Sequence, residues 1–174
     1  MALAVCVLFD PVGDRAVRQL WARLEAHGIP TLVSHTHGLH RPHLSYAVLR
    51  RWDLDRVLTA LAALPAGGPF PITVQGTVFF PRGRAALAAA VNAGVVARQE
   101  AVVGAAVAAG ADLHHHSAPG HWVPHISAST RAHGTQQAVT SSAINDILPL
   151  TLVASAAAVV DSGTGAAWPL PFIP

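Results

Sequence analysis

The sequence contains no lysine, so its strongly basic side chains are all arginines. Acidic residues are also few, and the formal net charge is only +2. Because alanine is so abundant, we attribute the exclusive use of arginine to coding bias and regard it as weak evidence for nucleic-acid binding. Charged residues make up 11% of the chain and hydrophobic residues 52%, a composition that excludes intrinsic disorder.

Cysteine is limited to Cys6, which lies in an apolar run and excludes an internal disulfide framework. That run, residues 2–9, has no basic segment before it and ends at Asp10, which argues against a signal peptide. A second apolar run, residues 147–160, is too short to span a membrane and contains Pro149. We therefore expect a soluble, cytoplasmic protein that does not associate with membranes.

The clearest motif is the tetrapeptide Pro-His-hydrophobic-Ser, which occurs twice. The first copy is Pro-His-Leu-Ser at residues 42–45, and the second is Pro-His-Ile-Ser at residues 124–127. The separation of the two copies is about half the length of the chain. This spacing favours two similar halves that share one cleft.

Each copy opens a run of apolar and small residues that is typical of a β-strand. Side chains alternate between the two faces of a strand, so His43 and Ser45 must share one face, as must His125 and Ser127. Such a strand presents an imidazole and a hydroxyl to a cleft and hydrophobic side chains to the other side. Two of these strands facing one another would surround one substrate with two imidazoles and two hydroxyls.

Hydrophobic periodicity divides the rest of the chain into helices and strands. Helices are expected at residues 12–27, 53–64, 94–109 and 136–148. Strands are expected at residues 2–9, 43–49, 72–80, 85–91, 122–130, 151–160 and 166–173. Residues 32–41 are expected to form a histidine-bearing loop or short strand, and residues 111–119 a histidine-rich loop. The alternation of helices and strands in two similar halves indicates a bilobal α+β or α/β fold.

The paired motifs resemble the hallmark of two-histidine (2H) phosphoesterases, in particular the bacterial 2′-5′ RNA ligase-like and cyclic phosphodiesterase branches. The proline before each motif and the aromatic Trp122 before the second one fit the same pattern. The resemblance spans essentially the whole chain. The sequence departs from the commoner pattern in having serine instead of threonine in both motifs, and it has no lysine to contact a phosphate.

This resemblance implies a single domain over residues 1–174, built from two interleaved lobes with one motif each. The implied fold is α+β and pseudo-symmetric, with two largely antiparallel sheets and flanking helices around a central cleft. The implied substrates are RNA ends or small nucleotide phosphodiesters. No cofactor and no metal are expected, and we expect the chain to act as a monomer.

The resemblance also implies a reaction, in which 2′,3′-cyclic phosphates or 2′-5′-linked nucleotides are cleaved by two-histidine acid–base catalysis. His43 and His125 would be the catalytic pair, because imidazole can give or take a proton near neutral pH. Ser45 and Ser127 would donate hydrogen bonds to the non-bridging phosphate oxygens. Arg131 lies on the same strand face as His125 if the strand continues that far, which makes it a candidate phosphate clamp. The symmetric pair does not reveal which histidine is the acid.

Nine of the eleven histidines fall in two windows, residues 35–43 and 114–125, and each window leads into and includes a motif histidine. The loops at residues 35–40 and 114–121 would line the same lip of the cleft, and their spacing matches no particular zinc signature. We rank a solvated loop above substrate contact, and substrate contact above a metal site. Two alternatives to the metal-independent phosphodiesterase therefore stay open: a metal-dependent hydrolase that uses these histidines, and a repurposed or non-catalytic nucleotide-binding protein of the same fold.

Overall fold

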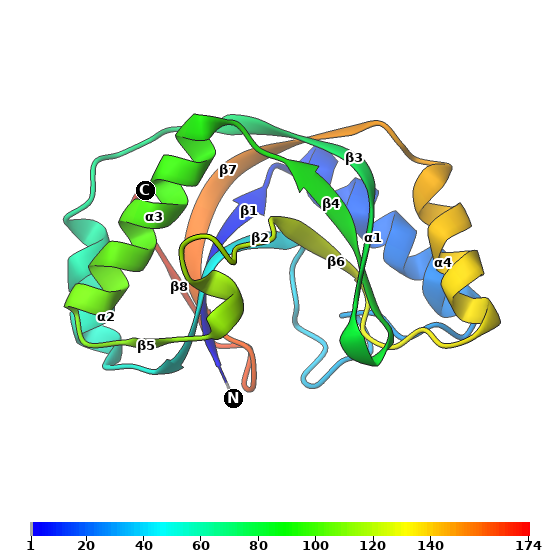
Figure 1. The fold of residues 1–174 in the computed structure, drawn as a ribbon, viewed down its shortest axis with the longest axis horizontal. Helices are drawn as coiled ribbons and strands as arrows, with labels where there is room; N and C mark the ends of the chain where they lie inside the picture. Colours follow the sequence, from blue (N-terminus) through cyan, green and yellow to red (C-terminus); the bar gives the residue numbers. More distant parts are fainter. Residues whose placement is uncertain (1) are drawn as a thin grey trace.

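The computed structural model describes residues 2–174, which form one eight-stranded antiparallel sheet with four α-helices packed against it (Figure 1). The strands are β1 (Leu3–Phe9), β2 (His43–Arg51), β3 (Phe70–Phe80), β4 (Arg84–Ala90), β5 (Asp112–Leu113), β6 (His125–Ser129), β7 (Leu150–Asp161) and β8 (Ala167–Pro169). The helices are α1 (Pro11–Ala26), α2 (Leu54–Ala62), α3 (Ala93–Ala108) and α4 (Thr135–Asn145), with short 3-10 helices η1 (Pro81–Gly83) and η2 (His115–Ser117).

Strand β7 joins the two halves of the sheet, whose strand order is β5-β2-β1-β7-β3-β4-β6, with β8 added along β7. The second part of β7 pairs with β1 and the first part with β3, and both pairings meet at Ala154. The sheet curves into an arch with β7 along its top (Figure 1). The antiparallel α+β fold expected from the sequence is thus confirmed, and the two expected sheets are hydrogen-bonded into one.

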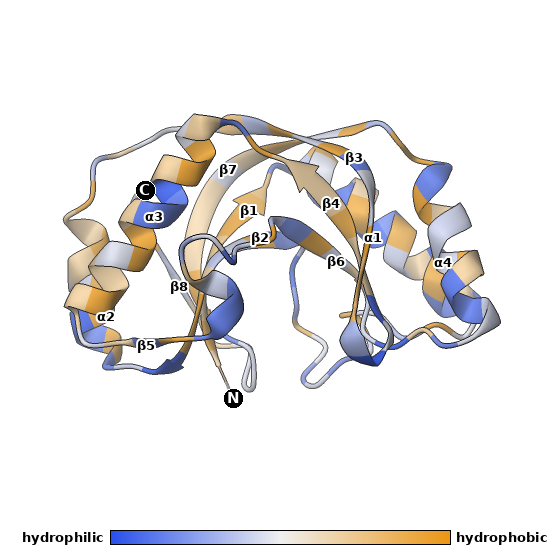
Figure 2. Cartoon of the chain, in the orientation of Figure 1, coloured by the Kyte–Doolittle hydropathy of each residue, from blue (hydrophilic) through white to orange (hydrophobic). Residues whose placement is uncertain are grey.

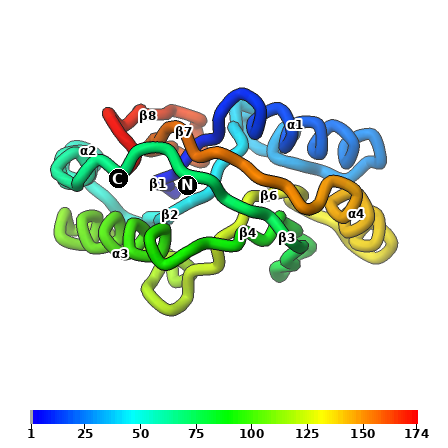
Figure 3. The backbone as a smooth tube through the Cα atoms, turned by 90° about the horizontal axis from the view of Figure 1, so that it is seen from above, coloured from blue at the N-terminus to red at the C-terminus, as the bar shows by residue number. Residues whose placement is uncertain are grey.

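The four helices form two pairs at opposite ends of the arch (Figures 1 and 3). Helices α2 and α3 pack together beside β2, whereas α1 and α4 pack together beside β6. Three of the helices begin at a side-chain cap: Asp10, Asp53 and Asn92 accept hydrogen bonds from backbone amides of the first turn. Each pair therefore combines one helix from each half of the sequence and stabilises one end of the sheet.

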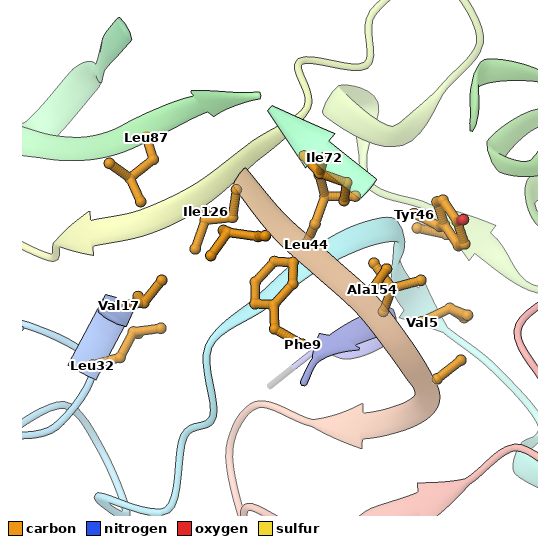
Figure 4. Close-up of a cluster of buried hydrophobic side chains, with 14 of the residues drawn as sticks. Val5, Phe9, Val17, Leu32, Leu44, Tyr46, Ile72, Leu87, Ile126 and Ala154 are labelled. Atoms are coloured by element: carbon orange, nitrogen blue, oxygen red, sulfur yellow. The ribbon is translucent and has the colours of Figure 1, made fainter. Parts of the chain in front are cut away.

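The hydrophobic core lies between the sheet and the helices, and the motif strands contribute to it directly (Figure 4). Leu44 and Tyr46 of β2 and Ile126 of β6 are fully buried in this core. Figure 2 shows the apolar residues gathered along the strands and the inner faces of the helices. Because the hydrophobic residues of each motif point into the core, the histidine and serine of each motif must point to the opposite, concave face of the sheet.

Two of the expected strands are shorter in the structure. The strand expected at 122–130 begins only at His125, because Pro124 has no backbone amide to pair and directly precedes it. The strand expected at 166–173 is reduced to Ala167–Pro169. Conversely, the loop expected at 111–119 contains the short strand β5 and the helix η2. Within residues 2–174, no helix is both long and apolar enough to cross a membrane.

Candidate active site

The two motif strands approach each other across the concave face of the arch, although they belong to opposite ends of the strand order. Strands β2 and β6 contact one another without sharing a ladder of hydrogen bonds. His43 and His125 are close enough for a positive charge on His43 to lower the pKa of His125. The curvature of the sheet therefore brings the motifs together, as the duplication in the sequence predicted.

The side-chain orientations follow the alternation expected for both motifs. In β2, His43 and Ser45 are partly exposed while Leu44 is fully buried. In β6, His125 and Ser127 are partly exposed while Ile126 is fully buried. The same face of β6 continues to Ser129, whose buried Oγ has no hydrogen-bond partner within residues 2–174. An unpartnered buried hydroxyl is costly, so Ser129 is a further candidate for contact with a bound ligand.

The rings of His43 and His125 are oriented in the same way by their own backbones. Nδ1 of His43 lies 2.7 Å from the carbonyl oxygen of Arg41, and Nδ1 of His125 lies 2.7 Å from that of Val123. A carbonyl can only accept a hydrogen bond, so each Nδ1 must carry the proton and donate it. In both rings Nε2 is then the nitrogen left to take or give a proton.

Two tryptophans hold the backbone of the motif serines. Nε1 of Trp122 donates a hydrogen bond of 3.0 Å to the carbonyl oxygen of Ser45, and Nε1 of Trp21 donates one of 2.8 Å to that of Ser127. Trp122 precedes β6 but fixes β2, while Trp21, from α1, fixes β6. Each motif is therefore anchored by an indole that lies outside its own strand.

Burial lowers the pKa of both motif histidines below the ordinary value, because a charged imidazole loses hydration there. The hydrogen bonds to Arg41 and Val123 oppose this shift. For His125, the nearby charges of His43, Arg84 and His116 lower the pKa further. Both imidazoles are thus biased toward the neutral form.

Two adjoining cavities open at the motifs. The larger one, here called the His43 chamber, has a volume of about 700 Å³ and lies against β1, the second half of β7 and the loop before β2. The smaller one, here called the His125 cavity, has a volume of about 350 Å³ and is lined by Ser45, Ser127 and Ser129 as well as His125. Ser127 lines both cavities. A phosphate held at Ser127 would therefore lie where the two cavities meet.

The structure does not bring Arg131 to these cavities. Strand β6 ends at Ser129, so the alternation that would have placed Arg131 beside His125 does not extend to it. Arg131 is exposed and lines a separate small cavity with Pro30 and Ser34. The other four predicted site residues all line the two cavities.

Arg41 lines the His43 chamber, and sequence reasoning missed it. Arg84 is a second cationic residue that it missed. It begins β4 and lines the His125 cavity together with Phe80, whose ring lies 4.7 Å from that of His125. Strand β4 pairs with β6, which puts the small side chains of Ala86 and Ala88 opposite Ser127 and His125. Finding Arg84 required the pairing of β4 with β6, which no local pattern in the sequence specifies.

The two histidine-rich segments line different cavities: His37 and His40 line the His43 chamber, whereas His114 and His116 line the His125 cavity. The loop before β2 stacks His37 on His40 with ring centres 4.1 Å apart, and burial together with the charges of His37, His43 and His35 lowers the pKa of His40 to about 4. At η2, the rings of His114 and His116 lie 5.0 Å apart. Within residues 2–174, no group of three or more His, Cys, Asp or Glu side chains is arranged to hold a metal ion.

Comparison with known proteins agrees with this geometry. The model of the 2′-5′ RNA ligase superfamily matches residues 10–166. The chain belongs to this superfamily of 2H phosphoesterases. No curated protein sequence matches it.

Solved structures share the fold at low sequence identity. A structure titled as a phosphoesterase has a TM-score of 0.57 at 13% identity and covers 98% of this chain and 94% of its own. Escherichia coli LigT in complex with NADP+ has a TM-score of 0.55 at 14% identity, with 97% and 93% covered. Kluyveromyces marxianus Usb1 has a TM-score of 0.54 at 13% identity, with 98% of both chains covered. At these identities the likeness shows the fold.

Proposed function

We propose that the protein is a metal-independent phosphodiesterase that cleaves 2′,3′-cyclic phosphates or 2′-5′-linked nucleotides with His43 and His125 as the acid–base pair. The observation that carries this proposal is the matched orientation of the two rings. Each Nδ1 is occupied by a backbone carbonyl 2.7 Å away, which leaves two Nε2 atoms available around one site. Imidazoles fixed in this way can exchange protons with a substrate without rearranging.

In hydrolysis of a 2′,3′-cyclic phosphate, one imidazole takes a proton from water as its oxygen attacks phosphorus. The other imidazole protonates the ribose oxygen as its bond to phosphorus breaks. Ser45 and Ser127 supply hydroxyl donors to the non-bridging oxygens, where negative charge builds up in the transition state. The depressed pKa of each histidine favours a neutral base, and mutual repulsion opposes double protonation of the pair.

The substrates that we propose are RNA ends or small nucleotides, acted on by a monomer of one interleaved two-lobed domain. The neighbouring structures support this choice, because one Usb1 structure contains uridine monophosphate and the LigT structure contains NADP+. The superfamily itself supports an enzyme acting on phosphate esters.

A small substrate panel tests the proposal. Uridine 2′,3′-cyclic phosphate and 2′-5′-linked diuridine would be incubated with the protein and with the His43→Ala/His125→Ala double variant. We expect turnover of at least one of them by the wild-type protein and none by the double variant. Turnover of neither substrate, in a folded sample, would contradict the proposed function and favour a non-catalytic binding protein.

A further inference from the structure

The two sides of the site differ strongly, although the motifs are alike. His43 lines only the larger chamber and His125 only the smaller cavity, while Ser127 lines both. A phosphodiester held at Ser127 between the two histidines would therefore send one ester substituent into each space. The lining of each space indicates what kind of substituent it accepts.

The His43 chamber has an aliphatic wall and a polar rim. The wall comes from the concave face of β1 and β7 and from the segment after β8, and it includes Ala4, Leu8, Ala156, Ala158, Val160 and Leu170. The rim is the loop before β2, which contributes His35, His37, His40 and Arg41. None of the described residues that line the chamber is phenylalanine, tyrosine or tryptophan, so the aliphatic wall offers a nucleobase no such ring to stack on.

Several polar side chains near the aliphatic wall of this chamber are engaged within the protein. Ser162 bonds both the amide and the carbonyl of Ala2, and the Thr36 hydroxyl lies 2.9 Å from Nε2 of His40. Nδ1 of His37 accepts from the amide of Leu39, while its Nε2 is buried without a partner. Against the aliphatic wall a buried nucleobase would leave its own donors and acceptors unpaired, which is costly. An aliphatic group carries no such cost.

The His125 cavity differs from the chamber in its aromatic faces. Arg84, His114 and His116 give it cationic or proton-bearing groups, and the rings of Phe80 and Trp122 give it aromatic faces. The unpartnered hydroxyl of Ser129 is a further hydrogen-bonding group. Aromatic faces with nearby positive charge suit a nucleoside and its phosphate.

We infer that the substrate is an asymmetric phosphodiester, with a nucleoside in the His125 cavity and an aliphatic alcohol in the His43 chamber. This inference rests on the proposed function, and it also separates the roles of the two histidines. The chamber volume of about 700 Å³ lies within the range of roughly 300–1,000 Å³ that is usual for small-molecule pockets. His43 adjoins the aliphatic alcohol and is its proton donor, and His125 adjoins the ribose and is the base.

A nucleoside 3′-alkyl phosphate is cleaved by attack of its own 2′-hydroxyl. The ribose 2′-oxygen forms a bond to phosphorus and gives its proton to Nε2 of His125. The bond from phosphorus to the alkyl oxygen breaks, that oxygen keeps the electron pair, and Nε2 of His43 protonates it. The products are a nucleoside 2′,3′-cyclic phosphate and the free aliphatic alcohol.

A substrate series on the wild-type protein tests the chamber. The kcat/KM values of uridine 3′-hexyl phosphate, uridine 3′-methyl phosphate and 3′-5′-linked diuridine would be compared, with uridine 2′,3′-cyclic phosphate alongside. Each methylene buried in the chamber adds about a fourfold preference, so we expect the hexyl ester to be cleaved at least about tenfold faster than the methyl ester. We also expect it to be cleaved faster than the dinucleotide.

The outcomes separate this inference from the proposed function. The cyclic phosphate has no second alcohol, so its turnover tests the proposed function alone. If it is hydrolysed but the hexyl ester is cleaved no faster than the methyl ester or the dinucleotide, the aliphatic assignment is overturned while the proposed function stands.

A matched pair of variants on β7 adds a second test. Val160→Phe fills the chamber and should reduce the hexyl-to-methyl ratio toward one. Val153→Phe makes the same change at an exposed position that lines neither cavity, and it should keep the wild-type ratio. An unchanged ratio in folded Val160→Phe would contradict the chamber as the alkyl site.

The separate roles of the histidines can be tested with a leaving group that needs no proton. The 4-nitrophenyl ester of uridine 3′-phosphate releases a stable phenolate. Its cleavage should be much less damaged by His43→Ala than cleavage of the hexyl ester is, whereas His125→Ala should damage both equally. If His125→Ala retained cleavage of the 4-nitrophenyl ester, or if both variants lost cleavage of both esters equally, the assignment of His43 as the acid would be overturned.

Discussion

A positive charge on His43 lowers the pKa of His125, so the two imidazoles titrate as a coupled pair. Burial lowers both pKa values in the same direction. Repulsion between the rings disfavours the doubly protonated state, so protonation of one ring leaves the other neutral. That is the state an acid–base pair needs at the start of a reaction.

Loss of either histidine should therefore disable the pair. We expect His43→Ala and His125→Ala each to lower turnover of a cyclic phosphodiester by at least about a hundredfold, the usual scale for removing a general acid or base. The double variant should lose much less than the product of the single losses, because the two rings act as one unit. Steady-state rates of the wild-type protein, the two single variants and the double variant measure these losses directly.

Serine variants provide the comparison. Ser45→Ala and Ser127→Ala each remove one hydrogen bond to the phosphate and leave proton transfer intact, so their losses should be smaller. Near wild-type turnover in either histidine variant would contradict two-histidine catalysis for that substrate.

Replacing Arg84 should shift the pH dependence of the reaction rate. Its charge is one of the causes that lower the pKa of His125, after burial and along with His43 and His116. Arg84→Gln removes that charge, so the pKa of His125 should rise toward its ordinary value and one limb of the bell-shaped rate profile should move to higher pH. The titration of His125 by NMR and the pH–rate profile measure the shift.

Arg82→Gln is the matched control, because Arg82 lies in the same turn but does not line the His125 cavity. A limb that moves equally in both variants, or that moves to lower pH in Arg84→Gln, would contradict the electrostatic coupling.

The two indole hydrogen bonds should matter for both activity and stability. Trp21→Phe and Trp122→Phe each remove one donor from a motif carbonyl, which should cost about 1 kcal/mol of the free energy of unfolding. Trp21→Phe should cost more than this, because Trp21 is fully buried and the smaller ring leaves a cavity. Turnover should fall as well, because the serine and histidine of the affected motif lose their anchor. Denaturant unfolding and kcat for cyclic phosphate hydrolysis report the two effects.

Trp52→Phe controls for the change of ring, since Trp52 packs against the core and lines neither cavity. If Trp52→Phe lowered kcat as much as the other two variants, the positioning role would be refuted.

The sequence predicted the motif strands well, because alternation along a strand is a local property. The apolar partners Leu44 and Ile126 define which face is buried, and this places His43 and His125 on the other face. The strand pairing itself is not local, so the sequence did not show that β4 would bring Arg84 beside His125. The same limit explains Arg131, whose expected position depended on a strand that ends at Ser129. The unequal cavities also depend on pairing, since β1 and β7 form the chamber wall only when they lie side by side.

The last prediction concerns the histidines of η2, which distinguish proton transfer from metal catalysis. If His43 and His125 transfer the protons, no metal ion is required, and hydrolysis should survive chelation with EDTA. A metal enzyme would lose activity on chelation and regain it when zinc or a related ion is added back. Replacing His114, His115 and His116 together by asparagine tests the same point without a chelator. We expect this variant to remain active with at most weaker substrate binding, since all three residues are exposed and outside both motifs, and only His114 and His116 line the His125 cavity. Abolished turnover in a folded variant that has also lost bound metal would instead establish the metal-dependent hydrolase.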